Sequence, residues 1–386
     1  MKEKKNWIIR VVTALVCFCT SGVAFRLLGI RVLQYKECWS TFYYNSKIAN
    51  EILSIEGLPY LVRTFFLQFF ANPIHGAIVI ASLLTCIMIA LTITTKKVKN
   101  IWMKNALPLF FTFIIGTLIA TSLSGMGLLQ VFGFHVDPQN MQFMRLSVMT
   151  RHQDWDAIIS ETGDNTPISN LLIQNTLNTA LAEKGILGDK IFDQPCEDIR
   201  SIYVDVIKTP EIAAMLSDIY YSMGHIAQAQ RYAFEANEKM NNLSPRLLQR
   251  LVQTNIIYGQ YDVAKKYLKW LDNAYYYHDW CEHYYTLLSD NTSNADPEIS
   301  MKRKCLIEDN RFSGIRGLDD DLLHIARATK GTTQCRTTIH YLGSLYILAG
   351  YEQQFVSMID EFKGTPDLPQ PLPHYFEEYY KRAKTE

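Results

Sequence analysis

The sequence predicts an all-α protein with N-terminal transmembrane helices followed by a tetratricopeptide-like α-helical repeat (solenoid) domain. Two observations support this prediction. Long uncharged apolar runs occur only in residues 1–134, and helix–turn–helix patterns with a turn glycine recur through residues 135–363. Charge is divided in the same way: residues 1–134 hold 13 Lys and Arg against 4 Asp and Glu, and the remainder holds 25 against 34. The neutral chain of 386 residues is therefore a basic apolar part joined to an acidic part.

The membrane domain is predicted to contain several apolar segments of about 20 residues, the length that crosses the hydrocarbon core of a bilayer. The predicted spans are residues 7–30, 74–94 and 105–132. A cleaved signal peptide ending at Ala24 is an alternative for the first segment. Residues 58–71 are predicted to form a helix lying in the membrane interface, because Arg63 and Gln68 interrupt an otherwise aromatic and apolar run.

Positive charge predicts the orientation of these spans. The strongest basic cluster follows the second span and consists of Lys96, Lys97, Lys99 and Lys104. Because loops rich in Lys and Arg stay in the cytoplasm, we expect this loop and the N-terminus to be cytoplasmic. The predicted location is a bacterial inner membrane, with multiple spans and a periplasmic C-terminal domain.

The clearest repeat pattern lies at residues 247–271, LLQRLVQTNIIYGQYDVAKKYLKWL. It predicts two helices joined by a turn at Gly259, and the same pattern recurs around Gly224, 35 residues earlier. Weaker copies lie upstream and near the end of the chain, and such hairpins must stack to bury their apolar faces. The residues predicted to pack the repeats are Trp155, Gly185, Gly224, Ala229, Gly259, Tyr261, Ala264 and Gly350.

Partner contacts are expected on the other face of this hairpin, at polar positions such as Gln249, Gln253 and Lys265. We expect a protein or peptide partner on the concave repeat face, and membrane lipid around the spans. Nucleic acid is not expected, because the acidic domain has no basic stripe. Residues 364–386 are predicted to be a proline-rich linker and a helix that caps the last repeat, with a partner-binding tail as the alternative.

The sequence contains no nucleophile elbow, phosphate-binding loop or dinucleotide fingerprint, so no catalytic residue, cofactor or metal is predicted. His278, Cys281 and His283 form the densest polar cluster, but their spacing does not place all three on one helix face. Asp319, Asp320 and Asp321 are expected at a helix start, where acidic residues are favourable. The cysteines of the acidic part, which allow one or two disulfides without a unique pairing, are Cys196, Cys281, Cys305 and Cys335.

The leading functional hypothesis is a membrane-anchored scaffold that has no activity of its own. The alternative is a membrane enzyme, or a subunit of one, that acts on lipid-linked glycans through Glu37, Glu51 and Glu56 of the first outer loop. A remnant of a larger transporter-like protein is a third hypothesis.

Four stretches resemble a known family. They are LVRTFFLQFFANPIHGAIVIASLL, MRLSVMTRHQDWDAIISE, NTALAEKGILGDKIFDQP and AFEANEKMNNLSPRLLQRLVQTNIIYGQYDVAKKYLKWL. The chain resembles uncharacterised multi-pass membrane proteins of Bacteroidales bacteria that carry a tetratricopeptide-like portion. The resemblance implies an inner-membrane protein and brings no activity with it.

Overall fold

The computed structural model describes residues 2–95, 101–162, 170–193, 199–204, 209–289, 296–307 and 315–385. Within these ranges the regular structure is helical, apart from isolated bridges of Leu368 with Lys363 and Thr365. The prediction of an all-α protein is therefore confirmed. Four residues named above lie outside the described ranges: Lys96, Lys97, Lys99 and Cys196.

The chain forms two compact units. The first unit is Met1–Arg145 together with Asn273–His278, and the second is Leu146–Asp272 together with Asp279–Glu386. The predicted domain boundaries after residues 134 and 363 remain predictions.

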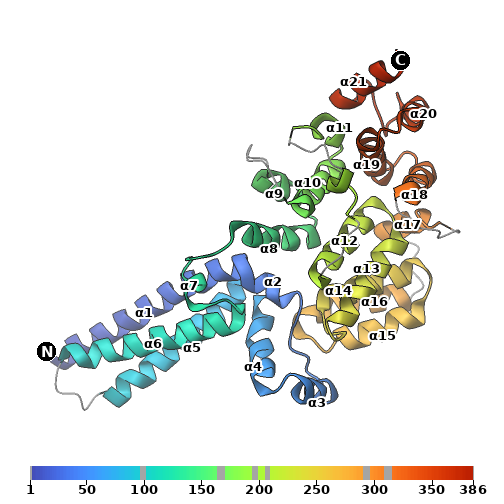
Figure 1. Cartoon of the computed structure of the whole chain (residues 1–386). Coiled ribbons are helices and arrows are strands. Elements are labelled where there is room, and N and C mark those ends of the chain that lie inside the picture. Colours follow the sequence, from blue (N-terminus) through green and yellow to red (C-terminus); the bar gives the residue numbers. More distant parts are fainter. Residues whose placement is uncertain are drawn as a thin grey trace. The chain divides into compact units, whose positions relative to one another are not determined.

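The first unit is built mainly from three long helices, drawn in blue to teal in Figure 1. Its elements are α1 (Lys2–Leu28), η1 (Gly29–Leu33), α2 (Gln34–Glu37), α3 (Ser46–Ile55), α4 (Leu58–Leu67), η2 (Gln68–Ala71), α5 (Pro73–Thr94), α6 (Ile101–Ser124), α7 (Leu128–Val131), the start of α8 (Pro138–Arg151) and η5 (Tyr275–Tyr277). Within the described residues, three stretches are long and apolar enough to cross a membrane: Ile8–Glu37, Pro73–Thr94 and Ala106–Ser124.

Two of these stretches differ from the predicted spans at their C-terminal ends. The first helical stretch continues to Glu37 through a π-helical turn at Gly29–Leu33. The third ends at Ser124 instead of residue 132, because Gly125 adopts a left-handed φ of +68° that a helix cannot continue through. The predicted interfacial segment 58–71 consists of α4 and η2.

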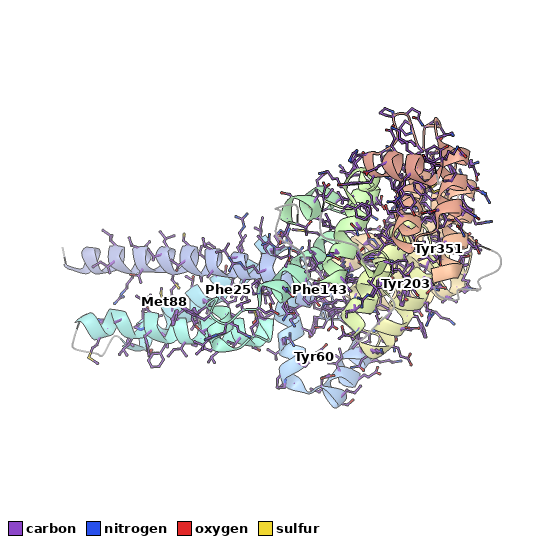
Figure 2. All side chains as sticks on the ribbon, turned by 45° about the horizontal axis from the view of Figure 1, so that its top comes forward. Phe25, Tyr60, Met88, Phe143, Tyr203 and Tyr351 are labelled. Atoms are coloured by element: carbon purple, nitrogen blue, oxygen red, sulfur yellow. The ribbon has the colours of Figure 1, made fainter. Side chains whose placement is uncertain are left out.

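The three long helices pack through small residues and buried apolar side chains. Ala77 and Ala81 of α5 are buried, and a Cβ added to Gly116 of α6 would lie 3.3 Å from Leu84. Phe25 and Met88 point into the same bundle and are also buried (Figure 2). The small residues therefore allow close helix packing inside the unit.

A short segment from later in the chain also belongs to the first unit. The Tyr277 hydroxyl donates to the carboxylate of Glu37, with both oxygens 2.9 Å away. The backbone N–H of Tyr44 donates to the carbonyl oxygen of Asn273 over 2.7 Å. The Tyr276 ring lies 6.1 Å from that of Phe69. These bonds hold Asn273–His278 within the unit.

The second unit consists of short helices joined by tight turns. Its elements are the end of α8, then α9 (Trp155–Thr162), α10 (Leu171–Glu183), α11 (Leu187–Lys190), η4 (Ile199–Ser201), α12 (Pro210–Met223), α13 (Ile226–Lys239), α14 (Pro245–Ile257), α15 (Tyr261–Leu271), α16 (His278–Ser289), α17 (Pro297–Lys304), α18 (Ile315–Ala328), α19 (Thr333–Ala349), α20 (Glu352–Phe362) and α21 (His374–Ala383). Consecutive helices form antiparallel hairpins, such as α12 with α13 and α14 with α15 (Figure 1).

The residues predicted to pack the repeats lie at these turns and interfaces. The predicted turn glycines all have left-handed φ values: +70° at Gly185, +88° at Gly224, +73° at Gly259 and +68° at Gly350. Ala229 and Ala264 are fully buried between helices. Trp155 and Tyr261 are half-buried at the first residues of α9 and α15. The glycines therefore reverse the chain, and the alanines allow the paired helices to approach closely.

The C-terminal helix α21 covers the end of the second unit. Phe376 is fully buried, with its ring 5.6 Å from Phe355 and 5.7 Å from His340. Tyr379 is also buried against Phe355, at 5.1 Å. These contacts agree with a capping helix, the first of the two roles considered for this segment.

Candidate functional site

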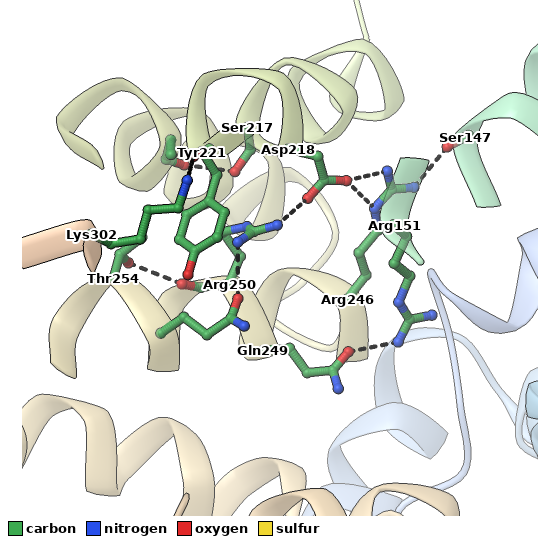
Figure 3. A network of polar contacts seen from close by, with 12 residues as sticks. Ser147, Arg151, Ser217, Asp218, Tyr221, Arg246, Gln249, Arg250, Thr254 and Lys302 are labelled. Atoms are coloured by element: carbon green, nitrogen blue, oxygen red, sulfur yellow. Dashed lines mark hydrogen bonds and ion pairs between the residues drawn. The ribbon is translucent and has the colours of Figure 1, made fainter. Parts of the chain in front are cut away.

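A polar cavity in the second unit has a volume of about 400 Å³. Its walls come from the end of α8 and the turn after it, and from α12, α14, α16 and α17, and Figure 3 shows part of them. The lining residues are Arg151, His152, Gln153, Asp218, Arg246, Gln249, Arg250, Gln253, Trp280 and Glu298. Three arginines face two carboxylates, so the cavity carries a positive charge within the acidic part of the chain.

Helix α14 contributes four of these side chains from one face. Arg246, Gln249, Arg250 and Gln253 are spaced by three or four residues, so they project from the same side of the helix. Pro245 begins the helix at a position where its missing N–H costs nothing. The opposite face of α14 supplies core residues, which fixes the orientation of the polar face toward the cavity.

Asp218 of α12 is the centre of a buried ionic network (Figure 3). Arg246 donates from Nε (3.0 Å) and from Nη2 to Asp218 Oδ2, and its Nη1 donates to the Ser147 hydroxyl over 2.7 Å. Arg250 Nη2 donates to Asp218 Oδ1 over 2.8 Å. Burial alone would raise the pKa of Asp218, but the two guanidinium groups outweigh it and hold the pKa below its usual value. Asp218 is therefore ionised at neutral pH and neutralises one of its two arginines.

The ring of Tyr221 lies beside this network and contacts two cationic side chains. The Arg250 guanidinium lies 3.6 Å from the centre of its ring, and the ammonium of Lys302 lies 4.7 Å away. The Tyr221 hydroxyl donates to Glu298 over 2.8 Å. Lys302 donates to the Tyr221 carbonyl and to Gln334 Oε1, each over 2.6 Å, and burial lowers its pKa. Lys302 is thus bonded within the core, and Arg250 is held rigidly at the cavity wall.

The rim of the cavity is more accessible. Arg151 is half-buried, and its Nη2 donates to Gln249 Oε1 over 2.7 Å (Figure 3). Arg250 Nη1 donates to Gln253 Oε1 over 2.9 Å. His152 is exposed, and partial desolvation together with Arg151 and Arg246 lowers its pKa to about 4. His152 is therefore neutral at physiological pH, and the arginines provide the positive charge of the rim.

Two of the three expected partner-contact positions, Gln249 and Gln253, line this cavity. Lys265 is not among its lining residues and is exposed on α15. The amide oxygen of each glutamine accepts from an arginine, so these bonds fix the orientation of both amide groups at the wall.

The acids of the enzyme hypothesis lie in different environments within the first unit. Glu37 is 1 % exposed and accepts from Tyr277, whereas Glu51 is exposed within α3 and Glu56 is exposed just after its last residue. In the part of the chain that the structure describes, there is no group of three His, Cys, Asp or Glu side chains that could hold a metal ion.

The remaining polar candidates have structural partners. Cys281, Cys305 and Cys335 are buried thiols, and burial raises the pKa of Cys281 to about 12. The ring of His283 lies 5.2 Å from that of Tyr284, and His278 is exposed. Asp319, Asp320 and Asp321 lie within α18, which begins at Ile315, and Asp321 accepts from the buried His225 over 2.9 Å.

Comparison with known proteins gives a family for the chain. The sequence model of a family of unknown function, DUF6057, matches residues 5–125 and 118–380. The chain belongs to this family. Comparisons with the curated proteins and with the solved structures find no match. The residues matched to DUF6057 include the three apolar helices and every residue of the cationic cavity.

Sequence reasoning missed the charged residues of this cavity in the DUF6057 chain. Arg246 and Arg250 flank Gln249 on the polar face of the best-defined hairpin, so the helical spacing contained a signal for them. Asp218 interrupts a buried helix, and a charge there indicates a paired or functional group. Their pairing, and the presence of Arg151 and Trp280 at the same cavity, depends on tertiary packing that the sequence pattern does not contain.

Proposed function

We propose that this protein is a membrane-anchored helical-repeat scaffold that binds an acidic segment of a protein or peptide partner. The observation that carries the proposal is the cavity lined by Arg151, Arg246 and Arg250, in a chain whose other unit has three helices apolar enough to cross a membrane. On this proposal the protein has no catalytic activity of its own, and it concentrates its partner at the membrane.

The chemistry of the cavity favours carboxylates in an extended peptide. Guanidinium groups bind carboxylates through paired, charge-assisted hydrogen bonds. Arg151 is the most accessible of the three arginines, while Asp218 keeps the other two rigid. The amides of Gln249 and Gln253 suit the donors and acceptors of a peptide backbone, and the ring of Trp280 offers an apolar surface beside them.

We further propose that the protein lies in a bacterial inner membrane, with its N-terminus in the cytoplasm and the second unit in the periplasm. The positive residues that follow the second apolar helix support this orientation. The 35-residue spacing of Gly224 and Gly259 supports a tetratricopeptide-like repeat. The resemblance to Bacteroidales membrane proteins supports the bacterial assignment.

Peptide binding to the full-length protein in detergent micelles tests the proposal. The probes are short fluorescent peptides that contain paired Asp or Glu residues, and the same peptides with Asn or Gln in their place. We expect the acidic peptides to raise fluorescence anisotropy on binding, and Arg151→Gln to weaken that binding about tenfold or more, because a charge-assisted bond is lost.

Lys265→Gln removes an exposed positive charge outside the cavity and should leave binding unchanged. Equal binding of acidic and amide peptides, or wild-type affinity in Arg151→Gln, contradicts the proposal. Hydrolysis or transfer of a lipid-linked glycan by the purified protein would instead favour the enzyme hypothesis.

A further inference from the structure

The first unit contains a groove of about 520 Å³ between α1 and α6. Both helices pack against α5, and they touch each other little, which leaves a channel between them. The residues along its two walls are Val16, Thr20 and Ala24 of α1 and Leu109, Phe113 and Thr117 of α6. Leu84 of α5 also contributes to the lining, so all three apolar helices line the groove.

The groove is mostly apolar, although several of its residues carry hydroxyl groups. Thr20 donates to the Val16 carbonyl over 2.8 Å, and Thr117 donates to the Phe113 carbonyl over 2.9 Å. Thr112, deeper in the groove, donates to Pro108 over 2.7 Å. Because each of these hydroxyls donates within its own helix, its proton is not available to a ligand.

One end of the groove is closed by the element that follows α6. Val131 of α7 and Phe132 both line the groove, and the Phe132 ring stacks on Phe113 with centres 5.8 Å apart. Because this end is closed, the groove does not run along the whole length of the helices.

A second copy of the bundle does not fit this surface well. Membrane helices associate closely where small residues face outward. Here the glycines are already used within the unit: Gly116 faces Leu84, and Gly22 faces Ala81. The rim of the groove instead carries Phe113 and other bulky side chains, which prevent a neighbouring backbone from approaching.

We propose that the groove binds an acyl chain of a membrane phospholipid. The apolar helices that form it are those expected to lie in the bilayer, where acyl chains surround every exposed surface. The groove volume of about 520 Å³ suits a flexible acyl chain and is too small to hold a helix of about 10 Å diameter. The head group would lie outside the groove, which has no polar partner for it, so the site would select a hydrocarbon chain and not a particular head group.

Photolabelling tests this inference on the full-length protein in lipid nanodiscs. The probe is a phosphatidylethanolamine that carries a diazirine in one acyl chain, and labelled peptides are identified by mass spectrometry. We expect labelling to be strongest at the groove walls, around Thr20 and Phe113. Ala24→Phe should fill the groove and lower this labelling to the level of the outer helix faces, and Thr117→Phe should do the same from the opposite wall.

Matched controls lie beside the two substituted residues. Val23 and Leu118 are 61 % and 60 % exposed and do not line the groove, so Val23→Phe and Leu118→Phe should leave groove labelling unchanged. Uniform labelling around α1 and α6 would show ordinary boundary lipid and overturn the inference. Cross-links between two copies through the groove would also overturn it. Peptide binding at the cationic cavity is measured separately, so either proposal can fail alone.

Discussion

The two units differ in the hydrogen-bond partners of their polar side chains. On the apolar helices of the first unit, hydroxyls bond within their own helix: Thr85, Thr112 and Ser124 each donate to the carbonyl four residues earlier. In the second unit, several buried polar side chains also bond across long sequence distances. Gln334 donates to the carbonyl of Ser222 over 2.9 Å, and Lys302 donates to that of Tyr221 over 2.6 Å.

The two kinds of hydrogen bond place different requirements on how helices pack. A helix that satisfies its own polar groups can enter a bilayer at little cost, and its partners are then chosen by shape and small residues. Where a polar group is satisfied only by another helix, the two helices must pack in the right arrangement. Otherwise the group is buried without a hydrogen bond, which lowers stability. The second unit should therefore be more sensitive to single polar substitutions than the first.

The largest effect is expected at Asp218. Asp218→Asn keeps the shape of the side chain but leaves Arg246 and Arg250 buried without their counter-charge. Removing one partner of a buried ionic network costs about 3–5 kcal/mol of unfolding free energy. Urea denaturation of the full-length protein in detergent, followed by near-ultraviolet circular dichroism, measures this loss.

Asp193→Asn is the matched control, since Asp193 is half exposed and its nearest ammonium, that of Lys190, is 3.8 Å away. We expect that variant to stay within about 0.5 kcal/mol of the wild type. Adding Arg246→Met and Arg250→Met to Asp218→Asn should recover part of the lost stability. A loss below about 1 kcal/mol for Asp218→Asn would mean that the network does not specify the packing of the second unit.

The same difference explains what sequence reasoning could and could not predict. The length of the apolar segments predicted the long helices of the first unit. Each of these helices satisfies its own polar groups, so it can be recognised from its own stretch of sequence. The turns at Gly224 and Gly259 were also predicted, because a left-handed residue is a local requirement. The network of Asp218 was not predicted, because its partners lie 28 and 32 residues away on another helix. The groove between α1 and α6 likewise depends on how whole helices pack.

The next effect concerns the pH dependence of the second unit. His340 is buried, its Nδ1 accepts from the Gly188 N–H over 3.1 Å, and burial lowers its pKa to about 4 from the ordinary 6.5. The folded state therefore favours neutral His340, so its contribution is complete above pH 6.5 and is lost as the pH falls toward 4. The expected loss from this group is about 3 kcal/mol over that range.

His340→Gln retains an acceptor for the Gly188 N–H but does not titrate, so its unfolding free energy should fall less between pH 6.5 and 4. His374 is exposed nearby on α21, and His374→Gln should keep the wild-type pH dependence. Unfolding by urea at several pH values measures both slopes. Identical slopes for His340→Gln and the wild type would show that another group controls the acid response.

The smallest effect uses one substitution in both units. Thr338 of α19 donates to the carbonyls of Met223 and Gln334 and accepts from the Gln334 amide, whereas Thr112 of α6 bonds only to Pro108 in the described residues. Thr338→Val should cost about 1–2 kcal/mol, because a bond between helices is lost and its partners stay buried. Thr112→Val should cost about 0.6 kcal/mol or less, the usual value of a polar contact in a membrane helix.

Hydrogen–deuterium exchange of the full-length protein in detergent can compare the two variants locally. Peptides from α12 and α19 should lose protection in Thr338→Val, whereas peptides from α6 should remain close to wild type in Thr112→Val. Both residues are buried and both substitutions replace a hydroxyl by a methyl group, so packing volume is matched. Equal losses in the two variants would mean that the first unit also depends on its hydroxyls, and the contrast between the two units would then lie only in their charged residues.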